Sequence, residues 1–393
     1  MSSSQAGERH WLSWTRIKHY AQITLYLNIL IGSSAMFYWW MTSETRPLFI
    51  TSDLAVFWIA GGLASSGHGI LAYDPEQIRK ILELHAPLIQ GRYGWFYPPT
   101  FLLIVVPMGY VSYGAAYLGF MVASVMGYWQ IMKRLLPMRS ALWCVAAFPG
   151  IWINLLTGQN GLLTGAIASA ALFFLPKRQM LAGALIGLLA IKPHLAMLFP
   201  LALLAVGAWE ALVVAAMTVG IFAMLSGMVL GFDTWSYWQH SLGLARAIME
   251  GGGTAVMMPT AFSFLRMLHA PLAVAYAGQF LVAAGAAAAV WIVWRTKVVF
   301  PVKAAALMTA SLLATPYLFE YDLAWLGPVL AWIAPVAYRN ARYRYERELL
   351  LAAWWLPIAT ILIARMIHVQ IGPWFLGALL WMIVRHAQEP ETP

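Results

Sequence analysis

One carboxylate, Asp53, has the surroundings of a general base. It follows the first long apolar segment, within the stretch TSDLAVFW, where water can reach the carboxylate while aromatic neighbours hold it near a lipid surface. Such a group can take a proton from a hydroxyl if the hydroxyl comes within hydrogen-bond reach and the surroundings tune the pKa of the carboxylate. The alternative interpretation is an Asp that caps a loop helix.

Positively charged side chains near apolar segments could bind a phosphate. A Lys or Arg close to lipid is costly unless it has a partner, and such residues usually have a function. The candidates are Lys192, His194, Arg246 and Arg365. Lys192 interrupts an apolar run just before Pro193, and it could instead extend to the membrane surface. Arg365 could be an exposed charge at the rim of the protein.

Aromatic, amide and acidic side chains could bind a sugar or an acceptor. Ring faces suit sugar rings, and amides or carboxylates can exchange hydrogen bonds with hydroxyls. The candidates are Tyr97, Gln159, Asn160, Trp238, His240, Glu320 and Asp322. Tyr97 could instead belong to an aromatic belt at the membrane surface, and Gln159 with Asn160 could simply form a tight turn between helices.

Several kinds of chemistry have no support in the sequence. There is no His, Asp or Glu pattern with metal-ligand spacing, no phosphate-binding P-loop and no dinucleotide glycine fingerprint. The single cysteine, Cys144, cannot form an internal disulfide or a thiolate metal cluster. The net charge of +9 is spread over short clusters and forms no continuous basic face. We therefore expect no metal, no cofactor and no nucleic-acid partner.

The composition indicates a protein whose solvent is the lipid bilayer. Hydrophobic residues make up 62% of the 393 residues and charged residues 10%, with a mean hydropathy of +0.72. A crossing needs about 20 apolar residues. The predicted spans lie near 23–41, 115–132, 141–156, 160–175, 180–191, 193–207, 211–230, 272–294, 301–315, 323–337, 349–366 and 373–384. The sequence therefore predicts an all-α polytopic membrane protein, one transmembrane domain over 1–393 with about twelve spans.

The placement of Lys and Arg predicts the orientation, because loops near spans keep positive charge in the cytoplasm. Basic clusters lie near 9–18, 133–139, 177–178, 295–303, 339–347 and 385. Both termini should then be cytoplasmic. The outer side receives a first loop, 44–99, that contains Asp53, and a second segment, 231–271. Short juxtamembrane helices are expected there, one beginning at Asp74-Pro75 and another over 101–108.

Taken in order, these segments resemble family 87 glycosyltransferases. The resemblance rests on Asp53 soon after the first helix, a Gly-rich stretch that ends in Tyr73-Asp74, and then FYPP over 96–99. It continues with GQN over 158–160 and a segment from Ala182-Gly183 to Lys192-Pro193. The chain departs from the family pattern after Lys192, where GAWE over 207–210 replaces an expected basic pair.

The resemblance implies a GT-C-type bundle in a bacterial inner membrane, with a periplasmic active site. The donor would be a polyprenyl-phosphate sugar, with mannose favoured, and the acceptor a lipid or a glycan. Asp53 would activate the acceptor hydroxyl in an inverting transfer that needs no cofactor. Two other interpretations remain open. A transporter or flippase of a lipid-linked sugar could use broken helices around Lys192, although the sequence has no internal repeat, and a scaffold subunit would need no catalytic carboxylate.

Overall fold

The computed structural model describes residues 11–42, 52–85, 94–136, 138–339 and 344–388. Helices account for 83% of the structure, and these ranges contain no strand. The prediction of an all-helical protein is therefore confirmed. Parts of two predicted basic clusters, at 9–10 and 340–343, and parts of the predicted first loop, at 44–51 and 86–93, lie outside the described residues.

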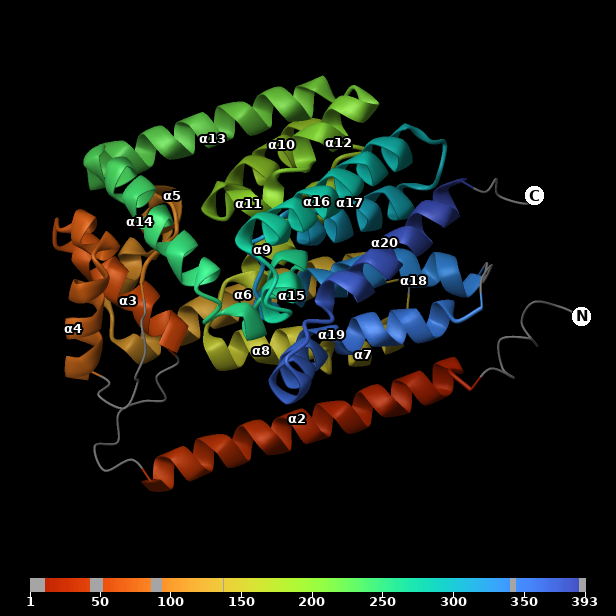
Figure 1. The fold of residues 1–393 in the computed structure, drawn as a ribbon, viewed down its shortest axis with the longest axis horizontal. Helices are drawn as coiled ribbons and strands as arrows, with labels where there is room; N and C mark the ends of the chain where they lie inside the picture. The colour runs from red at the N-terminus through yellow and green to blue at the C-terminus, as the bar shows by residue number, and fades with distance from the viewer. Residues whose placement is uncertain (1–10, 43–51, 86–93, 137, 340–343, 389–393) are drawn as a thin grey trace, which may run out of the picture.

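The long helices run side by side along the horizontal direction of Figure 1. They are α2 (Trp14–Thr42), α6 (Tyr113–Leu135), α13 (Trp209–Leu230), α16 (Leu272–Arg295) and α19 (Glu346–Ile367). Four helices, namely α6, α13, α16 and α19, are long and apolar enough to cross a membrane. A fifth candidate forms if the bent pair 139–146 and 149–157 is one span. Among the described residues, this criterion supports a helical membrane protein, while the count of about twelve spans stays a prediction.

Shorter helices fill the bundle between the long ones, and they coincide with the other predicted spans to within a few residues. They are η3 (Arg139–Ala141), α7 (Leu142–Ala146), α8 (Pro149–Thr157), α9 (Gly161–Phe174), α10 (Gln179–Leu188), η4 (Leu189–Ile191), α11 (Pro193–Ala196), α12 (Phe199–Val206), α17 (Phe300–Ala314), η6 (Glu320–Trp325), α18 (Leu326–Arg339) and α20 (Gly372–Gln388). The apolar character of these segments specifies helices because backbone groups in lipid must be satisfied within the segment.

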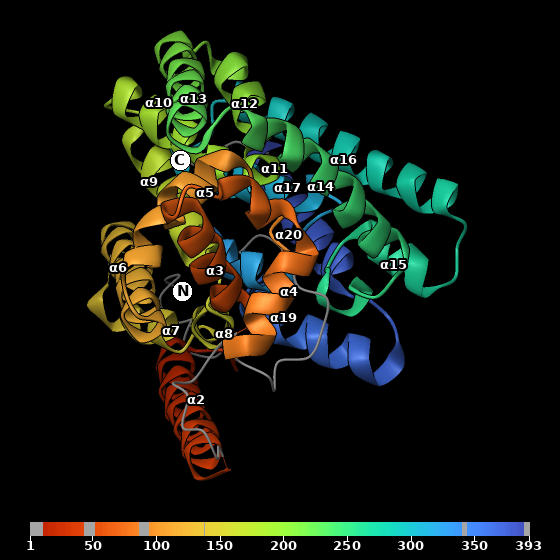
Figure 2. The same ribbon diagram turned by 90° about the vertical axis from the view of Figure 1, so that its left-hand side faces the viewer.

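The remaining helices gather at one end of the bundle, which we call the loop end (Figure 2). They are α3 (Ser52–Ser65), η1 (Gly69–Tyr73), α4 (Pro75–His85), α5 (Pro99–Val105), η2 (Val106–Tyr110), α14 (Asp233–Glu250), η5 (Ala255–Met257) and α15 (Ala261–Met267). The predicted start of α4 is confirmed, because the Glu76 backbone N–H donates a 2.9 Å hydrogen bond to Asp74 Oδ1. The predicted short helix at 101–108 is also present, as α5 and η2.

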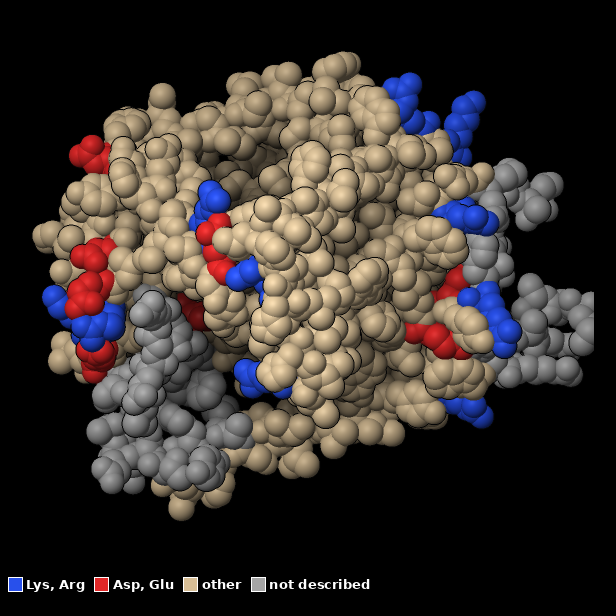
Figure 3. Space-filling view, viewed as in Figure 1, with Lys and Arg blue, Asp and Glu red and all other residues tan. Residues whose placement is uncertain are grey.

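Basic side chains gather at the opposite end, which we call the basic end (Figure 3). Successive long helices alternate in direction, so the described parts of the predicted Lys and Arg clusters fall at this end, where α2 begins and α20 ends in Figure 1. The short link between α12 and α13 lies there too. The sequence of this link lacks the expected basic pair, but the helices on either side of the link still run in opposite directions.

Candidate functional site

A group of buried and half-buried polar side chains lies where four connecting segments meet near the loop end. We call it the polar cluster, and its members are Tyr97, Gln159, Asn160, Lys192, Tyr321 and Asp322. The Lys192 ammonium donates to Asp322 Oδ1 at 2.6 Å and to Asn160 Oδ1 at 3.2 Å. Lys192 is 2% exposed and Asp322 is fully buried. The tyrosine hydroxyl of Tyr97 donates to Gln159 Oε1 at 2.9 Å.

The helix break at Lys192 has a local cause. Pro193 begins α11 and has no backbone N–H, and a proline disfavours the helical conformation in the residue before it. Lys192 accordingly takes the non-helical angles φ −146° and ψ 67°. The break between η4 and α11 therefore holds the ammonium inside the bundle, and the predicted interruption of the helix at this residue is confirmed.

The turn between α8 and α9 places the two amides. Gly158 ends α8 with a left-handed φ of 73°, a conformation that favours glycine. A Cβ added at Gly161 would lie 2.3 Å from the Tyr321 carbonyl oxygen. The start of α9 therefore approaches η6 closely only because position 161 has no side chain, and this contact brings Asn160 to Lys192 and Asp322.

Aromatic rings complete the surroundings of the Lys192 ammonium. Its Nζ lies 4.6 Å from the centre of the Tyr321 ring and 5.7 Å from that of Tyr97. Tyr321 in turn stacks on Phe319 with 5.3 Å between the ring centres. Both distances to Lys192 are within the range of cation–π attraction. The ammonium is thus stabilised by an ion pair with one carboxylate, a hydrogen bond to one amide and contacts with two ring faces.

Asp53, the predicted base, lies beside the polar cluster. It occupies the first turn of α3 and is partly exposed. The helix is held in place by Phe57, whose ring makes edge contacts at 5.4 Å with Tyr97 and at 5.1 Å with Phe101. The Asp53 carboxylate is in electrostatic range of Tyr97, Lys192 and Glu320. The structure therefore brings the loop carboxylate and the buried polar residues together.

Glu320 is a third acidic group at this site, beside Asp53 and Asp322. It lies in the link between α17 and α18, is 6% exposed, and its Oε2 has no hydrogen-bond partner among the described residues. Burial raises the pKa of Glu320 to about 8, and the nearby carboxylates of Asp53 and Asp322 act in the same direction. Glu320 therefore holds a proton at neutral pH and can donate as well as accept a hydrogen bond.

Three other predicted residues lie at the edge of the site. The ring of His194 makes an edge contact at 5.8 Å with Tyr317, and its Nε2 has no partner among the described residues. Trp238 Nε1 donates to the Phe96 carbonyl at 3.1 Å, which ties α14 to the segment that carries Tyr97. Arg365 is exposed at the loop end of α19 and is in electrostatic range of Glu320.

Two predicted residues have their contacts elsewhere. Arg246 is 68% exposed and donates to Glu250 Oε1 at 2.7 Å on the same helix. His240 is exposed and its Nδ1 pairs with the Ser236 carbonyl at 2.8 Å, also within α14. The structure does not bring either residue to the polar cluster.

Sequence reasoning missed Asn154 and Tyr317. Asn154 Nδ2 donates to the carbonyls of Gly150 and Tyr321, each at 2.8 Å, so it fastens α8 to η6 beneath the polar cluster. An amide within the apolar stretch IWINLL is the signal that could have identified it. Tyr317 gave no comparable signal, because its role depends on its contact with His194.

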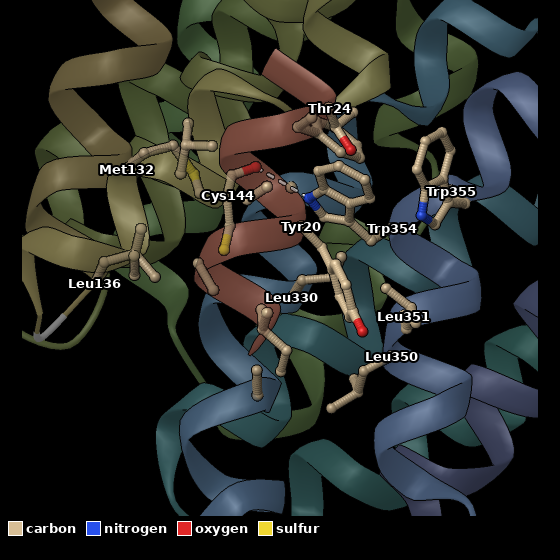
Figure 4. Close-up of a pocket in the computed structure, with 18 of the residues that line it drawn as sticks. Tyr20, Thr24, Met132, Leu136, Cys144, Leu330, Leu350, Leu351, Trp354 and Trp355 are labelled. Atoms are coloured by element: carbon tan, nitrogen blue, oxygen red, sulfur yellow. Dashed lines mark hydrogen bonds between the residues drawn. The ribbon is translucent and has the colours of Figure 1, made fainter. Parts of the chain in front are cut away.

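Two cavities lie away from the polar cluster. One of about 170 Å³ is at the basic end, where Tyr20 and Thr24 of α2 face Trp354 of α19 across an apolar space (Figure 4). Another of about 460 Å³ lies between α15, α16 and α20. Among the described residues, no group of His, Cys, Asp and Glu side chains could hold a metal ion.

The helical bundle and the polar cluster define the class of this protein. It is a helical membrane protein whose polar site is built from the connections between helices. A family model described as glycosyltransferase family 87 matches residues 95–316, more than half of the chain. The chain belongs to glycosyltransferase family 87. The match includes Tyr97, Asn160 and Lys192, whereas Asp53 and Asp322 lie outside it.

No curated protein and no solved structure matches the chain. Family membership makes the protein a glycosyltransferase, with a sugar donor and an acceptor as substrates. It favours the enzyme over the transporter and scaffold interpretations.

Proposed function

We propose that this glycosyltransferase transfers mannose from a polyprenyl phosphate to a hydroxyl of a lipid or glycan acceptor, with Asp53 as the general base. The observation that carries the proposal is the position of Asp53. A partly exposed carboxylate stands at the edge of a buried polar cluster, in electrostatic range of Lys192 and Glu320. An acceptor that approaches from the loop end would meet this carboxylate first.

In the proposed reaction, Asp53 takes the proton of the acceptor hydroxyl. The hydroxyl oxygen then forms a bond to the anomeric carbon from the face opposite the phosphate. The bond between that carbon and the phosphate oxygen breaks, and its electron pair leaves with polyprenyl phosphate. The configuration at the anomeric carbon is therefore inverted. Protein groups would contribute proton transfer and charge stabilisation, both of which depend on fixed positions.

The leaving phosphate needs positive charge, and the four predicted candidates differ in their freedom to supply it. Lys192 is already paired with Asp322 at 2.6 Å, and Arg246 is paired with Glu250. Arg365 is exposed and makes no ion pair with any described residue, although it is in electrostatic range of Glu320. We therefore assign the direct phosphate contact to Arg365, with the charge of Lys192 supporting it from inside the polar cluster and His194 offering a hydrogen bond at the edge of the site.

The sugar would be held by the polar atoms that lack partners. Within the described part of the chain, Asn160 Nδ2 and Glu320 Oε2 are buried without a hydrogen bond. Buried polar atoms usually have a partner, so a sugar hydroxyl that reaches them would satisfy them. Tyr97 and Trp238, whose rings border the Asp53 side of the site, would face the acceptor.

The proposal includes a location, a bacterial inner membrane crossed about twelve times, with the loop end in the periplasm. The gathering of Lys and Arg at the basic end supports this orientation. An accessibility assay with cysteine substitutions at Asp74 and Lys177 would test it. A membrane-impermeant reagent should label position 74 and not position 177 in intact cells.

The catalytic assignment is tested by Asp53→Asn in purified protein. This change keeps the size of the side chain and removes the base, so transfer of radiolabelled mannose from polyprenyl-phosphate mannose should fall by about 10²–10⁴-fold. Asp74→Asn is the matched control, because Asn also caps a helix well and should preserve both α4 and activity. Parental activity in Asp53→Asn would refute the role of this carboxylate.

A further inference from the structure

An apolar groove opens on the flank of the bundle between α15, α16 and α20. Its volume is about 460 Å³, which lies within the range of about 300–1,000 Å³ typical of small-molecule sites. The lining includes Phe264 and Leu265 of α15, Val282 of α16, Leu313 of α17 and Trp374 of α20. No charged side chain is among the lining residues. The groove therefore suits a hydrocarbon and not a head group.

The groove is hollow because glycines replace side chains along it. Gly285 of α16 and Gly377 of α20 both line it, and a Cβ added at either position would meet nothing within 4 Å. At Gly278, in contrast, an added Cβ would lie 2.4 Å from Leu265 Cδ1. Gly285 and Gly377 thus leave space that the protein itself does not fill.

The position of the groove within the membrane restricts its occupant. It lies along α16, one of the helices long and apolar enough to span a bilayer. Its lining residues come from the first two thirds of α16, the first half of α20 and the end of α17, so the groove extends from the loop end to about the middle of the bundle. A groove in this place faces lipid, so a hydrocarbon chain of the leaflet at the loop end is what can enter it.

Packing connects the groove with the polar cluster. Leu265, which lines the groove, belongs to the same hydrophobic group as Tyr317 and Phe319. The ring of Tyr317 contacts His194, and the ring of Phe319 stacks on Tyr321. A second connection comes from Gln279 of α16, whose buried Nε2 donates to the Leu313 carbonyl at 2.9 Å. One wall of the groove is thus continuous with the link that carries Glu320.

We propose that this groove holds the polyprenyl chain of the sugar donor while the phosphate and sugar reach the polar cluster. The inference rests on the proposed function, since it assigns a place to the lipid part of that donor. The groove would orient the anomeric carbon toward Asp53 by fixing the chain that precedes the phosphate. Apolar burial would supply the binding free energy without contact to the reacting atoms.

The test compares donors of different chain length in variants that fill the groove. Gly285→Leu and Gly377→Leu each place a side chain in the open space, and Gly220→Leu on the exposed face of α13 is the matched control, since a Cβ there also meets nothing within 4 Å. KM should be measured with undecaprenyl-phosphate mannose and with a ten-carbon citronellyl-phosphate mannose. In the groove variants we expect KM for the long donor to rise about tenfold, which corresponds to about 1.4 kcal/mol.

The outcomes separate the groove from the proposed function. The groove is supported if kcat and the KM for the short donor are unchanged in the groove variants, and if Gly220→Leu has no effect on the KM of either donor. Equal effects on both donors, or no effect on either, refute it while leaving the donor assignment intact. If the parental protein uses neither donor, the proposed function itself fails, and photo-crosslinking with an undecaprenyl phosphate probe then tests the groove alone. The groove is supported if the probe labels Phe264 or Trp374 in the parental protein and both groove variants abolish this labelling. The groove is refuted if the parental protein is not labelled at these residues.

Discussion

The ion pair between Lys192 and Asp322 should behave as one energetic unit. The two charged atoms lie 2.6 Å apart, with side chains 2% and 0% exposed. At an effective dielectric constant of about 20, their attraction is about 6 kcal/mol. Much of this offsets the cost of removing both charges from water. Loss of one partner leaves the other charge buried and uncompensated, so Lys192→Met or Asp322→Leu should each lower the free energy of unfolding by about 3–5 kcal/mol.

The double variant provides the decisive comparison. With both members of the pair replaced by apolar groups, neither charge is left buried without its partner, so Lys192→Met with Asp322→Leu should recover most of the stability lost by either single variant. The assay is unfolding by dodecyl sulfate in mixed micelles, followed by far-ultraviolet circular dichroism. Arg246→Ala is the control, because that residue is 68% exposed in its pair with Glu250 and should change the midpoint little.

Two results would refute this reasoning. Single variants as stable as the parental protein would mean that the ammonium is not confined between Asp322 and Asn160. Additive losses in the double variant would mean that each residue stabilises the protein separately. Activity should be lost in Lys192→Met and in the double variant even where stability returns, because both lack the charge of Lys192.

The remaining predictions concern the same region. Stability should fall as pH rises from about 4.5 to about 8, because folding raises the pKa of Glu320 to about 8 and the unfolded chain loses its proton earlier. Glu320→Gln should flatten that slope in the same micelle assay, and an unchanged slope would contradict the assignment. Gly161→Ala should reduce both stability and transfer, because the new Cβ would lie 2.3 Å from the Tyr321 carbonyl. Gly119→Ala, whose Cβ meets nothing within 4 Å, should leave both unchanged, and equal effects at the two positions would exclude this explanation.

Helix positions could be read from the sequence because lipid imposes a simple rule. A segment in hydrocarbon must satisfy its own backbone groups, so apolar runs become helices whatever they pack against. The predicted spans accordingly coincide with helices or helix pairs, and Pro193 ends the preceding helix at Lys192 as its ring requires. Asp74 likewise caps α4 through an interaction that spans two residues.

The candidate residues were identified in part by their chemistry alone. Lys192 was identified because charge is costly near lipid, whatever the packing, and Asp53 because it is a carboxylate soon after the first apolar segment. Arg246 met the same criterion, yet it pairs with Glu250 on an exposed face, and only its surroundings distinguish it from Lys192. The amide of Asn154 within an apolar stretch was a signal in the sequence, but its partner, the Tyr321 carbonyl across the bundle, could be identified only in the structure.

What the sequence by itself determined is where helices form, where one breaks, and which charged groups need partners. Which partner each charge receives was decided only by the tertiary structure. Lys192 meets Asp322 across 130 residues of chain, because α9 approaches η6 at a glycine and the break before Pro193 turns the lysine inward. Such pairings depend on how helices that are distant in the sequence pack together, and rules that consider only neighbouring residues do not predict these contacts.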